Sequence, residues 1–161
     1  MISGFITNKA FDFIINDFKK YVPVKIDMDR LGNLLFPPFK VVCDCVIISN
    51  EKKEYLEKYY LEQSESKDKT FYEARNTETR INEYIESDDM DICTEIELAF
   101  LVIKSWYMQL RHIDSDAKFC FIISCDENNV ELRFHKSRHN ERSWLGNNID
   151  IYNDPVGYII L

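Results

Sequence analysis

Residues 91–135 have the sequence DICTEIELAFLVIKSWYMQLRHIDSDAKFCFIISCDENNVELRFH, and the order of the patterns in this stretch decides the fold. Apolar residues recur at spacings of three and four over 96–110, which predicts an amphipathic helix. Phe119, Phe121 and Ile123 would share one face of a strand, and Val130, Leu132 and Phe134 would share one face of the next, which predicts a hairpin. We therefore expect an α/β fold of the α+β kind, with a mainly antiparallel sheet and helices packed on it.

Shorter patterns flank this stretch. Thr94 and Glu97 have capping-box spacing at the start of the long helix, and Thr70 and Glu73 have the same spacing farther upstream. The remaining predictions are a helix over 9–21 capped by Asn8, a strand over 22–28, a turn and loop over 30–39, a central strand over 40–49, a helix from Glu51, a helical pattern over 81–85 and a terminal strand over 156–161.

Length and composition predict one domain over 1–161. A chain of 161 residues with 45% hydrophobic residues can bury a packed core without disulfides or a metal. Its 4 glycines and 4 prolines argue against a disordered or fibrous chain. No internal repeat with a period of about 20–50 residues divides it further.

The N-terminal sequence and the cysteines predict a cytoplasmic protein. The first residues lack a basic region, and no apolar run approaches the roughly 20 residues of a membrane span. Five cysteines, an odd number, favour reduced thiols that are buried as small apolar residues. Cys93 directly precedes a predicted helix, but its acidic surroundings oppose a role as nucleophile.

The formal net charge of −8 is concentrated in the window 81–97. This window holds seven of the 28 acidic residues and no Lys or Arg, which leaves 21 acidic residues against 20 basic ones elsewhere. Nucleic-acid binding depends on clustered Lys and Arg, so the window favours a basic protein as partner rather than nucleic acid. The alternative is a solvated acidic loop that places carboxylates at a helix N-terminus. The acidic residues are Glu83, Glu86, Asp88, Asp89, Asp91, Glu95 and Glu97.

The candidate partner-binding residues are the acidic residues from Glu83 to Glu95 together with Trp144. Trp is enriched in interfaces, and Trp144 is preceded by polar residues and followed by Gly146 and two asparagines. Trp106 lies on the apolar face of the long predicted helix, so we expect it in the core.

His135, His139 and Glu141 are the candidate for a metal or acid–base site. Two imidazoles four residues apart meet on one face of a helix, and a nearby carboxylate could be a third ligand or a base. The patterns predict a strand end and a loop here, where that spacing no longer brings the side chains together. The sequence also lacks a Gly-rich phosphate loop and a Cys-x-x-Cys pair, so we expect no cofactor.

The last 70 or so residues resemble small immunity proteins of bacterial polymorphic toxin and contact-dependent growth inhibition systems. The resemblance is one of pattern: a helix with a central Trp, a Phe- and Ile-rich hairpin, and a characteristic C-terminal series. The residues that carry it are Trp106, Val130, Glu131, Leu132, Arg133, Phe134, His135, Arg138, Glu141, Trp144, Leu145, Asp150, Tyr152, Pro155, Val156, Gly157, Tyr158 and Ile159.

The resemblance implies a non-enzymatic cytoplasmic protein that binds one toxin domain, often a nuclease, and blocks its active site or its substrate path. The charge distribution independently favours the same hypothesis, because a nuclease needs a basic cleft and an acidic surface can fill it. Two alternatives remain. One is a metal-assisted hydrolase that uses His135, His139 and Glu141, and the other is a generic adaptor for a basic protein.

Overall fold

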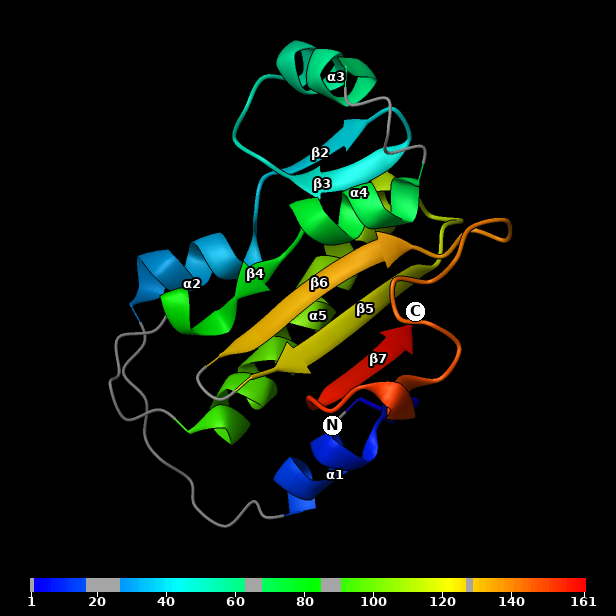
Figure 1. Cartoon of the computed structure of the whole chain (residues 1–161). Coiled ribbons are helices and arrows are strands. Elements are labelled where there is room, and N and C mark those ends of the chain that lie inside the picture. The colour runs from blue at the N-terminus through cyan, green and yellow to red at the C-terminus, as the bar shows by residue number, and fades with distance from the viewer. Residues whose placement is uncertain (1, 17–26, 63–67, 85–90, 127–128) are drawn as a thin grey trace.

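A computed structural model describes residues 2–16, 27–62, 68–84, 91–126 and 129–161, and it confirms the predicted fold class. A five-stranded antiparallel sheet has the strand order β1-β7-β5-β6-β4, and a separate two-stranded sheet pairs β2 with β3 (Figure 1). The elements in chain order are β1 (Ile6–Thr7), α1 (Lys9–Asn16), α2 (Met28–Leu35), β2 (Phe39–Val42), β3 (Cys45–Ile48), α3 (Lys53–Glu62), α4 (Lys69–Asn76), β4 (Thr79–Arg80), the 3-10 helix η1 (Ile81–Tyr84), α5 (Ile92–Ile113), β5 (Phe119–Cys125), β6 (Val130–Lys136), the 3-10 helix η2 (Ile149–Ile151) and β7 (Val156–Ile160).

Helix α5 crosses one face of the large sheet, as its periodicity predicts (Figure 1). Trp106 is fully buried at its centre and donates a hydrogen bond from Nε1 to the carbonyl oxygen of Leu34 at 2.7 Å. The predicted capping box is wrong, because the helix begins one turn earlier and the Asp91 carboxylate accepts the Thr94 N–H at 3.0 Å. Among the described residues, no helix is both long enough and apolar enough to cross a membrane.

The predicted hairpin and the predicted terminal strand are confirmed. Phe121 of β5 lies between Phe134 of β6 and Ile159 of β7, so β5 is the middle strand of the sheet. Asn8 then ties the N-terminal segment to β7. Its Oδ1 caps α1 by accepting the Phe11 N–H at 3.0 Å, and the same atom accepts the Val156 N–H at 3.1 Å. The predicted N-cap role of Asn8 is therefore confirmed.

The run 40–49 does not form one central strand, and this prediction is wrong. It folds into the β2–β3 hairpin, which turns at Cys43 and Asp44 with φ angles of 48° and 71°. Two consecutive residues at positive φ form the kind of turn that matches the twist of paired strands, but this turn normally carries Asn-Gly or Asp-Gly. The apolar run hides the turn because neither of those sequences is present.

The loop predicted over 30–39 is also wrong over its first part, where α2 forms. The Asp27 carboxylate caps this helix by accepting the N–H groups of Asp29 and Arg30 at 2.8 and 3.1 Å. Gly32 inside the helix costs about 1 kcal/mol relative to Ala, and the burial of Leu34 against α5 offsets that cost. The predicted strand over 22–28 lies largely outside the described residues, and its last residue begins α2.

Helices α3 and α4, which follow β3 in the chain, share a small core with the two-stranded sheet. Helices α3 and α4 pack on the β2–β3 hairpin around Leu56 and Tyr72. Helix α4 begins one residue before the predicted capping box, and its N-cap is Asp68, which accepts the Phe71 N–H at 3.1 Å. The predicted pairing of Thr70 with Glu73 is wrong, because the Glu73 carboxylate points to the sheets instead.

Side chains close the outer edge of β6 on either side of the short strand β4. The Glu95 carboxylate accepts the Val130 N–H at one end, and the Glu73 carboxylate accepts the Lys136 N–H at the other. Between them the Thr77 hydroxyl accepts the Phe134 N–H at 3.0 Å and donates to its carbonyl oxygen at 2.8 Å. An open strand edge invites pairing with another chain, and these groups occupy this edge.

Candidate partner-binding site at the acidic end

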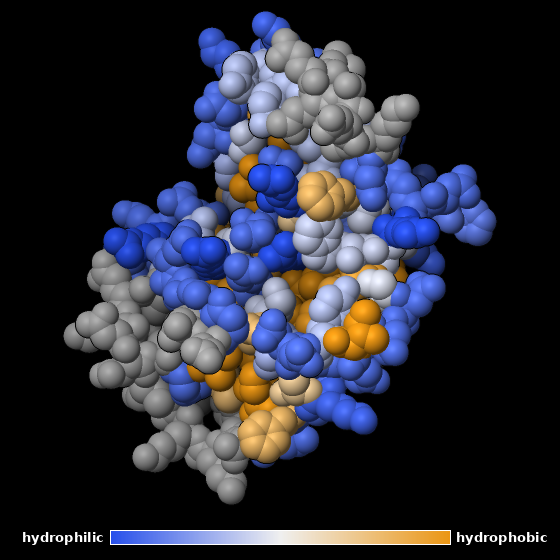
Figure 2. All heavy atoms as spheres, viewed as in Figure 1, coloured by the Kyte–Doolittle hydropathy of each residue, from blue (hydrophilic) through white to orange (hydrophobic). Residues whose placement is uncertain are grey.

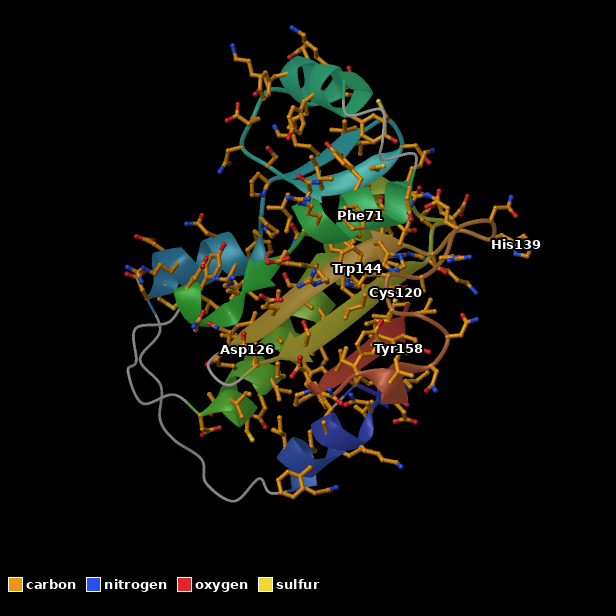
Figure 3. All side chains as sticks on the ribbon, in the orientation of Figure 1. Phe71, Cys120, Asp126, His139, Trp144 and Tyr158 are labelled. Carbon is orange, nitrogen blue, oxygen red and sulfur yellow. The ribbon has the colours of Figure 1, made fainter. Side chains whose placement is uncertain are left out.

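Described residues from two parts of the sequence without Lys or Arg, 81–103 and 119–132, meet at one end of the large sheet. Here η1, the first turns of α5 and the β5–β6 turn come together, and we call this surface the acidic end. Asn82 of η1 is hydrogen-bonded to Asn129 beyond the turn, and Val130 is hydrogen-bonded to Glu95 of α5. Asp126 marks the β5–β6 turn in Figure 3.

The exposed carboxylates of the acidic end come from three elements. Glu83 on η1, Glu97 on α5 and Asp126 in the β5–β6 turn are exposed. The described residues provide no ion-pair partner for Glu83 or Glu97. Asp91 is half-buried and is used as the N-cap of α5. Of the predicted partner-binding residues, Glu86, Asp88 and Asp89 lie outside the described residues.

Glu95 is 5% exposed, so its prediction as a partner-binding surface residue is wrong. It lies one turn before Ala99 and two turns before Val102 on the inner face of α5, and its Oε2 accepts the Val130 N–H at 3.0 Å. Burial raises the pKa of this carboxyl to about 7, and the negative charges of Asp126 and Asp91 act in the same direction. Charge counting along the sequence cannot distinguish the inner face of a helix from the outer one.

Glu73 is a second buried carboxylate, and sequence reasoning missed its role. Its two oxygens accept the N–H groups of Val46 and Lys136, both at 2.8 Å. They also accept a two-pronged contact from the Arg138 guanidinium at 2.8 and 3.0 Å. This contact joins α4, both sheets and the segment after β6. No local pattern signals it, because its partners are 27 to 65 residues away in sequence.

His135, His139 and Glu141, the candidate residues for a metal or acid–base site, have separate surroundings in the structure. His135 is buried with both ring nitrogens engaged: Nδ1 donates to the Lys136 carbonyl at 2.9 Å and Nε2 accepts the Trp144 N–H at 3.4 Å. Burial lowers the pKa of this imidazole, which favours its neutral form. His139 is exposed on the segment after β6 and points away from the sheet (Figure 3). The Glu141 carboxylate instead accepts the N–H and the hydroxyl of Thr70.

Trp144 lies on the opposite face of the sheet from α5, near Phe71 and away from Asp126 (Figure 3). Its ring is half-buried, with its centroid 5.1 Å from that of Phe71 and 5.4 Å from the Arg133 guanidinium carbon. Figure 2 shows hydrophobic side chains gathered over the middle of this face. Trp144 therefore covers the sheet and does not belong to the acidic end.

A pocket of about 330 Å³, part of it open solvent, lies beside Glu141. It is lined by Thr70, Cys120, His135, Ser137, Arg138, Glu141, Arg142, Ser143 and Ile160. Its inner polar groups are already engaged, since Thr70 binds Glu141 and Arg138 binds Glu73. Burial raises the pKa of the Cys120 thiol to about 12, so the pocket does not present a thiolate. We assign this pocket to the scaffold.

The expectation that the cysteines are buried holds for three of the five. Cys45, Cys120 and Cys125 are buried, and burial raises the pKa of each thiol to about 12. Cys43 and Cys93 are half-buried, and the five cysteines form no disulfide among the described residues. Among the described residues, no group of three or more His, Cys, Asp or Glu side chains is placed to hold a metal ion.

Comparison with known proteins places the chain in a family. A model described as the Uncharacterized protein PM0498 family matches residues 6–160. The chain belongs to this family. No curated protein and no solved structure matches the chain. The matched range begins at β1 and ends in β7, so it includes both sheets and every helix between them.

Proposed function

We propose that this protein is an immunity protein that binds a basic toxin domain, of the nuclease kind, through its acidic end. The convergence of two segments without Lys or Arg at one end of the sheet carries the proposal. The resemblance of the last 70 or so residues to immunity proteins gives independent support. The proposed protein acts in the cytoplasm by occupying the active site or the substrate path of the toxin, and it performs no chemistry itself.

The acidic end suits such a partner electrostatically. Its exposed carboxylates lie on three elements, so their field extends over a surface and not along a single helix. A surface of one sign attracts an oppositely charged partner and raises the association rate, and salt screens this attraction. A nuclease domain carries positive charge where it binds phosphates, which is the matching surface.

The test combines growth rescue with association kinetics. Expression of this protein should restore growth of cells that make the toxin domain encoded immediately upstream, which a generic adaptor would not do. With the purified pair, Glu83→Lys combined with Asp126→Lys should slow association about 10-fold or more at low salt, and the salt dependence should flatten.

The start of helix α3 offers a matched control, because Glu51→Lys just before the helix with Glu54→Lys in its first turn makes the same change of charge at exposed positions far from the acidic end. This variant should associate close to the wild-type rate, and thermal unfolding of both variants verifies that they fold. Growth rescue with unchanged association of the acidic-end variant would move the interface elsewhere. Absence of both rescue and binding would refute the immunity function.

A further inference from the structure

The face of α5 that points away from the sheet has an unusual stripe. Its most exposed residues follow one another at spacings of four, three, four and three, which places them on one side of the helix. A helix lying on a sheet normally presents polar residues outward. Here the middle of the stripe contains Leu101 and Met108, which are 50% and 62% exposed. The stripe residues are Glu97, Leu101, Lys104, Met108 and Arg111.

The charges on this stripe are ordered along the helix. Glu97 lies at its N-terminal end, and Arg111, followed by His112, lies at its C-terminal end. The described residues provide no ion-pair partner for any of these three side chains. When a second copy of the stripe is turned end for end, acid faces base at both ends and Leu101 faces Met108 in the middle. Both ends and the apolar positions of the stripe are therefore complementary to a reversed copy, while Lys104 lies near the centre, where its flexible side chain extends outward to solvent.

A neighbouring aromatic side chain extends the apolar surface. Ser105 and Gln109 of α5 both donate hydrogen bonds to the Leu35 carbonyl oxygen at 2.7 Å, which fixes the end of α2 beside the stripe. Phe36 follows directly and is 67% exposed. A second helix laid along α5 would reach this ring on one of its flanks.

We propose that two copies of the chain pair through α5 as an antiparallel, two-fold symmetric dimer. A two-fold axis near Lys104 and Ser105 brings Glu97 of each copy opposite Arg111 of the other. Spacings of four and three are those of helices that pack side by side at about 20°. A 22-residue helix is about 33 Å long, so the pair buries less area than a typical stable interface of about 1,200–2,000 Å². The dimer is therefore weak, with a dissociation constant on the order of micromolar.

Sedimentation velocity of the intact protein, from micromolar to near-millimolar concentration, tests the proposal without any toxin. The wild type should shift from monomer to dimer as concentration rises. Leu101→Gln combined with Met108→Gln should remain monomeric, and both residues are exposed, so its thermal unfolding at low concentration should match the wild type. A wild type that stays monomeric throughout overturns the proposal.

The charge order gives a sharper test of the antiparallel arrangement. Glu97→Arg alone and Arg111→Glu alone should each weaken the dimer about 10-fold, because each removes two interactions per dimer and creates repulsion. The double variant Glu97→Arg/Arg111→Glu should restore dimerisation. The control Lys53→Glu/Glu57→Lys swaps an i,i+4 pair on α3 and should leave dimerisation unchanged. Failure of the double variant to recover overturns the arrangement, and none of these results depends on the proposed immunity function.

Discussion

Glu73 and Glu95 close opposite ends of the same edge of β6, but their charges are compensated differently. Both carboxylates are buried and both accept a backbone N–H of this strand. Glu73 also binds the Arg138 guanidinium through both oxygens. Glu95 has no basic group beside it among the described residues, and two further carboxylates raise its pKa. Glu73 therefore stabilises one end of the sheet through an ion pair, whereas Glu95 places an uncompensated carboxylate at the other end.

Removing the charge of Glu73 should have the larger effect. Glu73→Gln deprives the mostly buried Arg138 of its two-pronged partner and directs amide hydrogens towards backbone N–H groups. Breaking a buried ion pair from one side typically costs about 3–5 kcal/mol, so we expect a loss of about 3 kcal/mol in the free energy of unfolding, measured by urea denaturation. Glu57→Gln, which removes an exposed pair with Lys53, should cost less than about 0.5 kcal/mol. Equal losses for the two variants would show that the buried contact is not what holds this end together.

Removing the charge of Glu95 should have the opposite sign. The folded protein binds a proton at Glu95 with a pKa of about 7, whereas the unfolded chain binds it near 4.5. The contribution of this group to stability therefore falls as pH rises from about 4.5 to about 7. Glu95→Gln keeps an acceptor for Val130 and removes the charge. It should match the wild type near pH 5 and exceed it by up to about 3 kcal/mol at pH 8.

The difference between wild type and Glu95→Gln at the two pH values is the quantity to measure, since other groups titrate in both proteins. Among them is His135, whose lowered pKa contributes with the opposite pH dependence. Urea denaturation of both proteins at pH 5 and pH 8 gives this difference. If the two proteins lose or gain stability in parallel between these pH values, Glu95 is not an uncompensated carboxylate.

The sequence predicted the parts of the fold that rest on long, regular patterns. Helix α5 repeats its apolar spacing over several turns, and β5, β6 and β7 are rich in β-branched and aromatic residues, so neighbouring residues reinforce each prediction. The β2–β3 hairpin and α2 were missed for a local reason. Each depends on one feature that competes with a stronger pattern: the turn at Cys43 and Asp44 within an apolar run, and the Asp27 cap ahead of a segment with Gly32.

Only part of the candidate site could be predicted, because the rest depends on tertiary structure. The window 81–97 is a concentration of acidic residues that the sequence shows directly, but the burial of Glu95 depends on which face of α5 meets the sheet. Asp126 joins the surface only because the β5–β6 turn folds back beside α5. One signal could have found it, because 119–132 is a second segment without Lys or Arg. The contacts of Glu73 depend wholly on tertiary structure.

The smallest expected effect separates the two causes of the raised pKa of Glu95, which are burial and the neighbouring negative charges of the acidic end. Asp126→Asn and Asp91→Asn each remove one charge, while the amide oxygen can still accept the Asn129 N–H or cap α5. Each should lower the pKa of Glu95, with the larger effect from Asp126, by an amount worth about 1 kcal/mol or less. Carbon-detected NMR of the Glu95 carboxyl against pH measures the change, and Glu54→Gln on α3 should leave it unaltered. If neither aspartate variant changes the pKa of Glu95, burial alone raises it. Glu73 and Glu95 then differ only in that Arg138 binds Glu73. If both aspartate variants change this pKa, the carboxylates of the acidic end act on one another as a single charged surface.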